Sequence, residues 1–142
     1  MMRALDATTP AGSTPLAPLV ACARASRIVV ITDLLADAAD VVSAAALRVA
    51  SQNEVIVVHI IATEELHPPA GALLAVDPEA PTMRRMLDGS VRATYQDAFT
   101  RWMDETAAAI RAVGIRYVRA ATDEATPHLV RRIAGEAARR GA

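Results

Sequence analysis

The sequence contains no lysine, a single cysteine and few aromatic residues. All 15 basic residues are arginine, and they balance 16 acidic residues to give a formal net charge of −1. The chain therefore has no excess of positive charge with which to bind the phosphate backbone of a nucleic acid, and we do not expect a nucleic-acid partner. Cys22 stands alone, which excludes an internal disulfide. With 53% hydrophobic but only 3% aromatic residues, the core must be built mainly from Ala, Val, Leu and Ile.

Long apolar runs are also missing. Acidic residues such as Asp33, Asp37 and Glu64 interrupt the apolar segments well short of the roughly 20 residues that a membrane span needs. Residues 1–10 lack the basic start and apolar run of a secretion signal. We therefore expect no membrane span and a cytoplasmic location.

The 142 residues suit a single domain. Residues 1–13 are an irregular lead-in without periodicity, and residues 14–142 alternate between helical and strand patterns. The patterns predict helices at 14–26, 37–51, 90–113 and 126–140, and strands at 27–32, 54–61 and 115–121. A loop is expected at 62–71, followed by a hairpin of 73–76 and 82–86 around Asp77-Pro78-Glu79.

The order of these elements predicts an α/β fold. A helix separates the strands at 27–32 and 54–61, which indicates a βαβ unit with parallel neighbours. Residues 27–32 are almost wholly apolar, as in a central strand covered on both faces by helices. We expect a three-layer, doubly wound, Rossmann-like sheet. The apolar stripe at 91–113, which carries most of the aromatic residues, is expected to pack on that sheet rather than form a cofactor slot.

Asp33 and Thr14 are the strongest candidates for a site. Asp33 ends the strand at 27–32, and ligands of parallel sheets bind at the carboxyl ends of strands. Its carboxylate would either cap the following turn or bind a cation, and Thr14 could equally be a helix N-cap. Carboxylate and hydroxyl oxygens are hard donors that suit Mg²⁺.

Other titratable residues give weaker signals. The three histidines lie on different elements without zinc-type spacing, so a zinc enzyme is disfavoured. His59, inside a strand, is expected to be a hydrogen-bonded core residue. His67, beside two prolines, is expected to lie in a loop, and His128 to face solvent. Paired acids on proline-containing loops serve solubility and turns more often than acid-base catalysis; they are Glu64 with Glu65 and Asp77 with Glu79.

The order of short motifs resembles the von Willebrand factor A-like domains of the bacterial "domain of unknown function 58" family. The series comprises Gly12-Ser13-Thr14, 28–35, 55–61 with Glu64 or Glu65, 69–71, 77–79, 91–99, Gly114-Ile115 and Thr122-Asp123-Glu124. The resemblance implies a metal-ion-dependent adhesion site in which Thr14 and Asp33 match two of three ligand loops. The first loop, Asp-x-Ser-x-Ser, is missing, which weakens Mg²⁺ binding.

The resemblance further implies that the chain is the carboxyl half of such a domain. Residues 27–32 would then form an edge strand prone to self-association or to pairing with a partner. The leading hypothesis is a non-enzymatic protein-interaction module that works with a MoxR-type AAA+ ATPase. The alternatives are a small metal-dependent hydrolase, with Asp33 as ligand or nucleophile and His59 or Glu64 as acid-base, and a fragment of a longer protein without its own function.

Overall fold

The computed structural model describes residues 14–36, 38–69, 73–76, 82, 84–87 and 89–135. The lead-in at 1–13 and the predicted turn at 77–79 therefore lie outside the described residues. The helices are α2 (Leu16–Cys22), α3 (Ala38–Ala50), α4 (Thr63–Leu66), α5 (Gly89–Ala112) and α6 (Thr126–Gly135). The strands are β1 (Arg27–Thr32), β2 (Glu54–Ile61), β3 (Leu73–Val76), β4 (Arg84–Leu87) and β5 (Arg116–Ala121).

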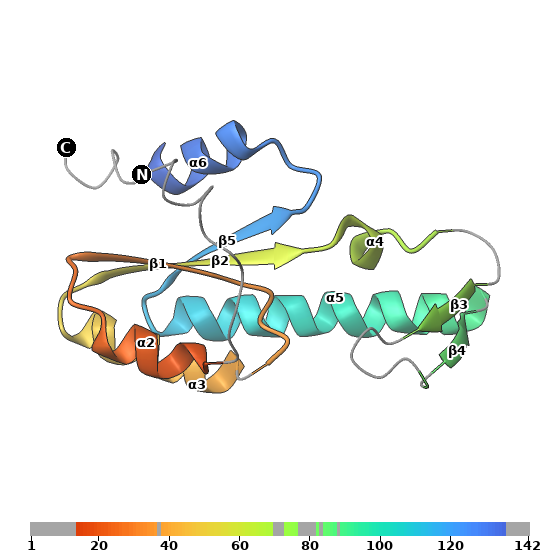
Figure 1. Ribbon diagram of the computed structural model, residues 1–142, viewed down its shortest axis with the longest axis horizontal. Coiled ribbons are helices and arrows are strands. Elements are labelled where there is room, and N and C mark those ends of the chain that lie inside the picture. Colours follow the sequence, from red (N-terminus) through yellow and green to blue (C-terminus); the bar gives the residue numbers. More distant parts are fainter. Residues whose placement is uncertain are drawn as a thin grey trace.

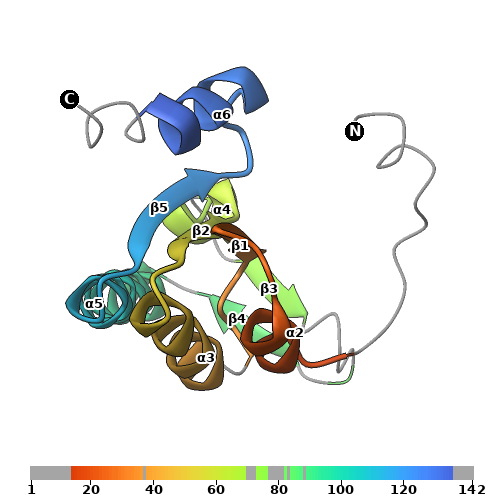
Figure 2. The same cartoon turned by 90° about the vertical axis from the view of Figure 1, so that its left-hand side faces the viewer.

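The main sheet has three parallel strands in the order β1-β2-β5. Helices α2, α3 and α5 lie on one face and α6 lies on the other (Figures 1 and 2). This arrangement confirms a mixed α/β fold with a helix-flanked parallel sheet, compatible with a Rossmann-like architecture. The expected hairpin is present as β3 and β4, which pair antiparallel and pack beside the start of α5 (Figure 1).

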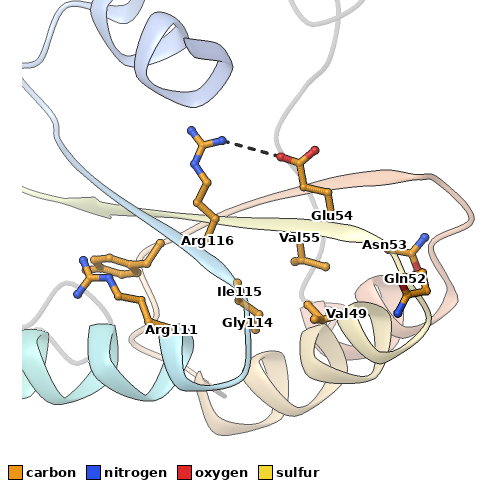
Figure 3. A pocket seen from close by; sticks show the side chains of 10 residues that line it. Val49, Gln52, Asn53, Glu54, Val55, Arg111, Gly114, Ile115 and Arg116 are labelled. Atoms are coloured by element: carbon orange, nitrogen blue, oxygen red, sulfur yellow. Dashed lines mark ion pairs between the residues drawn. The ribbon is translucent and has the colours of Figure 1, made fainter. Parts of the chain in front are cut away.

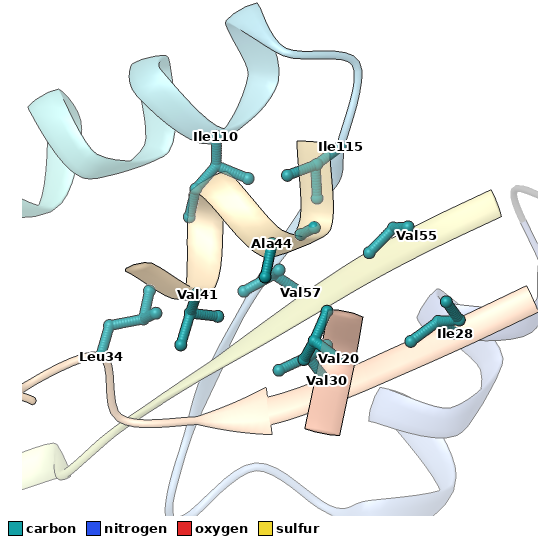
Figure 4. Close-up of a cluster of buried hydrophobic side chains, with 11 residues drawn as sticks. Val20, Ile28, Val30, Leu34, Val41, Ala44, Val55, Val57, Ile110 and Ile115 are labelled. Carbon is teal, nitrogen blue, oxygen red and sulfur yellow. The ribbon is translucent and has the colours of Figure 1, made fainter. Parts of the chain in front are cut away.

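Two apolar clusters hold the layers together. The larger one joins β1 and β2 to α2, α3 and α5 through side chains that include Val30, Val41, Val57 and Ile110 (Figure 4). The smaller one places Ile56, Val58, Val118 and Ala120 of the opposite sheet face against α6. Aliphatic side chains dominate both clusters, as the composition predicts.

The prediction of a central, doubly covered strand at 27–32 is wrong. Among the described residues β1 pairs only with β2, so it is an edge strand. Its side chains alternate between buried and exposed; Ile28 and Val30 are buried, whereas Val29 is 42% and Ile31 64% exposed. Helix α6 lies over β2 and β5, and β1 on that face is left without a covering helix in the described part of the chain (Figure 2).

Three smaller predictions also need correction. The first helix ends at Cys22 rather than near Ser26. The expected loop at 62–71 contains one helical turn, α4, in which Glu65 accepts a hydrogen bond from the Ala62 amide. The apolar stripe packs on the sheet only in the second half of α5, where its buried residues begin at Met103. The first half of α5 extends beyond the three strands of the main sheet that the structure describes (Figure 1).

Candidate functional site

The loop that follows β1 carries Asp33 at the carboxyl end of the sheet. The Thr32 hydroxyl accepts a hydrogen bond from the Leu34 amide, and Oδ1 of Asp33 accepts one from the Leu35 amide, both at 3.1 Å. Leu34 adopts φ = 57° and its side chain is buried. These local bonds fix the turn, so the capping interpretation of Asp33 is confirmed while its carboxylate stays exposed.

Thr14 lies just before α2 and is exposed. The N-cap of α2 is Pro15, with no side-chain hydrogen bond at the cap, so Thr14 is not the N-cap. Helix α2 runs back along β1, which brings the start of α2 to the end of the molecule where β1 stops (Figure 1). Thr14 and Asp33 therefore face the same end of the fold, but the structure records no contact between these two described residues.

The next strand places His59 beside this loop, with Thr32 of β1 as its register partner. His59 is 1% exposed, and its Nδ1 lies 2.7 Å from the hydroxyl of Tyr117. The rings of Trp102 and Tyr117 meet the imidazole edge to face, with ring centroids 5.4 Å and 5.8 Å from the imidazole centroid. The prediction of a hydrogen-bonded core histidine is confirmed.

Burial lowers the pKa of His59 below its ordinary value of 6.5. The backbone of Asp33 and the negative charges of Asp33 and Glu65 oppose this shift in pKa without reversing it. The imidazole is therefore neutral at pH 7. A neutral imidazole can share a hydrogen bond with the Tyr117 hydroxyl without a buried charge between the rings of Trp102 and Tyr117. Sequence patterns identified His59 and Asp33 as two separate candidates. The parallel pairing of β1 with β2 places them next to each other.

The loops after β2 and β5 join at the same end of the sheet. The Thr63 amide donates to the Thr122 hydroxyl at 3.2 Å, and the Thr122 amide donates to the Ile61 carbonyl at 3.0 Å. Glu64 is exposed on α4, whereas Glu65 is engaged by the Ala62 amide. This end thus offers hydroxyl and carboxylate oxygens from three loops.

The other predicted histidines lie on the elements that follow β2 and β5. His67 follows α4 and is exposed. His128 is 62% exposed and its Nδ1 lies 2.9 Å from Glu124. As predicted, His67 lies in a loop and His128 faces solvent. Asp77 and Glu79 lie outside the described residues.

A metal at this end would rely mainly on water. Within the described ranges, no three or more His, Cys, Asp or Glu side chains come together in a group that could hold a metal ion. Mg²⁺ takes six oxygen ligands and retains several waters where protein donors are few. Asp33 and Thr14 supply carboxylate and hydroxyl oxygens, which are donors of the kind that Mg²⁺ prefers.

A cavity lies at the opposite, amino end of the strands. It has a volume of about 780 Å³ and is lined by Gln52, Asn53, Glu54, Arg111, Arg116 and their apolar neighbours (Figure 3). Arg116 lies 3.9 Å from Glu54 and donates to the carbonyls of Arg132 and Ile133 at the end of α6. Arg116 therefore secures α6 to the sheet, a role that no sequence motif signalled.

Comparison of the chain with family models, curated proteins and solved structures yields no match. The fold defines the class as a helix-flanked, parallel α/β domain. In the described ranges no helix is both long and apolar enough to cross a membrane.

Proposed function

We propose that this chain is a non-enzymatic protein-interaction module whose partner adds a strand to the open edge of β1. The observation that carries the proposal is the position of β1, which among the described residues pairs on one side only. An edge strand presents a row of backbone donors and acceptors, and an extended segment of another protein can pair with them.

The side chains of β1 support the same proposal. Val29 and Ile31 lie in register with Ile56 and Val58 of β2, which α6 buries. The exposed pair on β1 therefore continues a buried apolar face of the sheet. A strand added beside β1, with apolar side chains on that face, would extend the cluster and remove these side chains from water.

The resemblance to the von Willebrand factor A-like family supplies the candidate partner and cofactor. We propose a MoxR-type AAA+ ATPase as the partner, with a weakly bound Mg²⁺ at Thr14 and Asp33 that bridges to a partner carboxylate. The placement of both residues at the carboxyl end of β1 is compatible with this proposal. In the absence of the partner, the same edge is expected to drive self-association.

The test is the solution molar mass, measured by light scattering over a range of protein concentrations. We expect a mass above the 15.0 kDa of one chain, because open edges pair with one another. Ile31→Lys should return the mass toward that of a monomer, since a charged edge residue opposes strand pairing. Leu47→Lys is the matched control, because Leu47 is 65% exposed on α3, away from the edge.

A wild-type monomer at every concentration would overturn the proposed edge. The metal is tested separately by repeating the measurement with Mg²⁺. A shift in mass or in thermal stability on adding Mg²⁺, lost in Asp33→Asn, would support the site, whereas identical curves for both proteins would remove Mg²⁺ from the proposal.

The hydrolase alternative draws on the closeness of Asp33 to His59, because Thr32, the residue before Asp33, is the register partner of His59. His59 is buried and bonded to Tyr117, so it is poorly placed to meet a substrate. Phosphatase assays with and without Mg²⁺ test this alternative; activity that is unchanged in Asp33→Asn would exclude the role given to Asp33.

A further inference from the structure

A second, smaller cavity lies along β5, the opposite edge strand of the described sheet. It has a volume of about 300 Å³ and is bounded by the second half of α5, by β5 and by α6. Three arginines from these three elements line it: Arg111, Arg119 and Arg132. Tyr117 and Asp104 complete its polar wall.

The guanidinium of Arg132 is held in place by its neighbours. Its Nη1 lies 2.8 Å from both carboxylate oxygens of Glu124, and its Nη2 donates to the Arg119 carbonyl at 2.8 Å. The two arginine bonds and the bond to His128 lower the pKa of Glu124, so its carboxylate stays charged. Arg132, on α6, is thereby held in place in the lining of the cavity.

Among the described residues, the other two arginines are not bonded to a carboxylate as Arg132 is. Arg111 lies over the ring of Tyr117, 5.1 Å from its centroid, in a cation-π contact that orients the guanidinium without neutralising it. The structure records no ion pair between Arg111 or Arg119 and any described carboxylate. Asp104 and Glu124 offset two of the three positive charges, which leaves an excess of one around the cavity.

Such an arrangement favours an anion. Guanidiniums present several fixed N–H donors and bind oxyanions by paired, charge-assisted hydrogen bonds. Positive groups drawn together from separate elements repel one another, and a bound anion relieves that repulsion. The Tyr117 hydroxyl is already engaged by His59, so the ring serves as a wall and the arginines supply the donors.

We propose that this cavity binds the phosphate group of a small molecule. A phosphate offers acceptor oxygens in several directions, which suits donors arriving from α5, β5 and α6, whereas a carboxylate offers two oxygens in one plane. Arg111, labelled in Figure 3, and Tyr117 also line the larger cavity, so the organic part of the same molecule has an adjoining polar space. The site is independent of the β1 edge and of the proposed partner.

The test is an NMR titration with inorganic phosphate at constant ionic strength, observing the side-chain Nε–Hε signals of the arginines. We expect saturable shifts at Arg111, Arg119 and Arg132. Arg119→Gln should weaken the affinity by about tenfold, the size expected for losing one charge-assisted contact. Arg131→Gln is the matched control, because Arg131 is an exposed arginine beside Arg132 that does not line the cavity.

Absent or unsaturable shifts at the three arginines would overturn the proposal, and so would equal shifts at Arg131. Equal weakening by Arg131→Gln would likewise show only a general charge effect. A parallel titration with acetate separates the two oxyanions: tighter binding of acetate would overturn the assignment to phosphate. Backbone spectra of each variant confirm that the fold is retained, which is expected because Arg119 and Arg131 are exposed.

Discussion

His59 shows how a single residue acquires its properties from both sequence and packing. Its place in an apolar strand already favours a core position, and the structure adds the phenol of Tyr117 and the edge of Trp102. The same burial that lowers the pKa of His59 removes it from contact with solvent. His59 therefore links β2 to β5 and α5, and it contributes to stability in a way that depends on pH.

We expect the free energy of unfolding to fall as the pH drops below 6.5, the ordinary pKa of histidine. The unfolded chain takes up the proton near that value, whereas folded His59 takes it up only at lower pH, so acid favours the unfolded state across this interval. Urea unfolding at several pH values between about 7.5 and 5 measures the slope. His59→Gln, which keeps a polar group near Tyr117, should flatten it; an unchanged slope would contradict the role of His59.

At the scale of elements, two helices end in the same backbone motif with different residues. After α5, the Gly114 amide donates to the Arg111 carbonyl and the Ile115 amide to the Ile110 carbonyl, the pattern of a Schellman motif. After α3, Gln52 takes the equivalent position with φ = 64°. Gly114 was recognisable as a stop signal, while Gln52 was not, because a left-handed glutamine has no local sequence signature.

Gly114→Ala is expected to lower the free energy of unfolding by about 1–2 kcal/mol, because φ at Gly114 is +79° and an added Cβ would lie 3.2 Å from Cγ1 of Val49. Gly89→Ala is the control, since Gly89 begins α5 and an added Cβ meets nothing within 4 Å. Chemical denaturation of both variants measures the difference. Equal stability of the two variants would contradict the strain expected from a Cβ at Gly114.

In the described residues, the main sheet has a central strand that helices cover on both faces and two edge strands that each pair on one side only. β2 is buried on both faces, by α2, α3 and α5 on one side and by α6 on the other (Figure 2). β1 and β5 flank it, and each carries one of the proposed binding surfaces. An apolar edge on β1 and an arginine-lined edge on β5 suit different occupants, so the two proposals can fail independently.

The larger core cluster should govern global stability. Ile110 is fully buried where α5 meets α3 and the sheet (Figure 4), and Ile110→Ala is expected to cost about 2–5 kcal/mol through lost burial and a residual cavity. Val130→Ala, at a side chain 55% exposed on α6, should change the free energy by less than about 0.5 kcal/mol. Urea denaturation compares them, and a small effect at Ile110 would argue against α5 as part of the main core.

The sequence by itself determined the kind and order of most elements. The helical and strand periods, the stop at Gly114 and the parallel βαβ unit are consequences of local patterns and short connections, so they could be predicted. The polar turn at Asp33 and the core position of His59 followed for the same reason, because each depends on neighbours close in the chain.

Only the tertiary structure decided which strand lies at an edge and which distant residues meet. An apolar sequence indicates that a strand tends to be buried, but it does not determine how many neighbouring strands the fold provides. The apolar pattern of β1 therefore predicted a central strand, whereas β1 lies at an edge of the described sheet. Arg111, Arg119 and Arg132 carry no shared spacing; they converge because β5 runs between α5 and α6. Binding surfaces of this kind arise from packing between elements, which local sequence patterns do not encode.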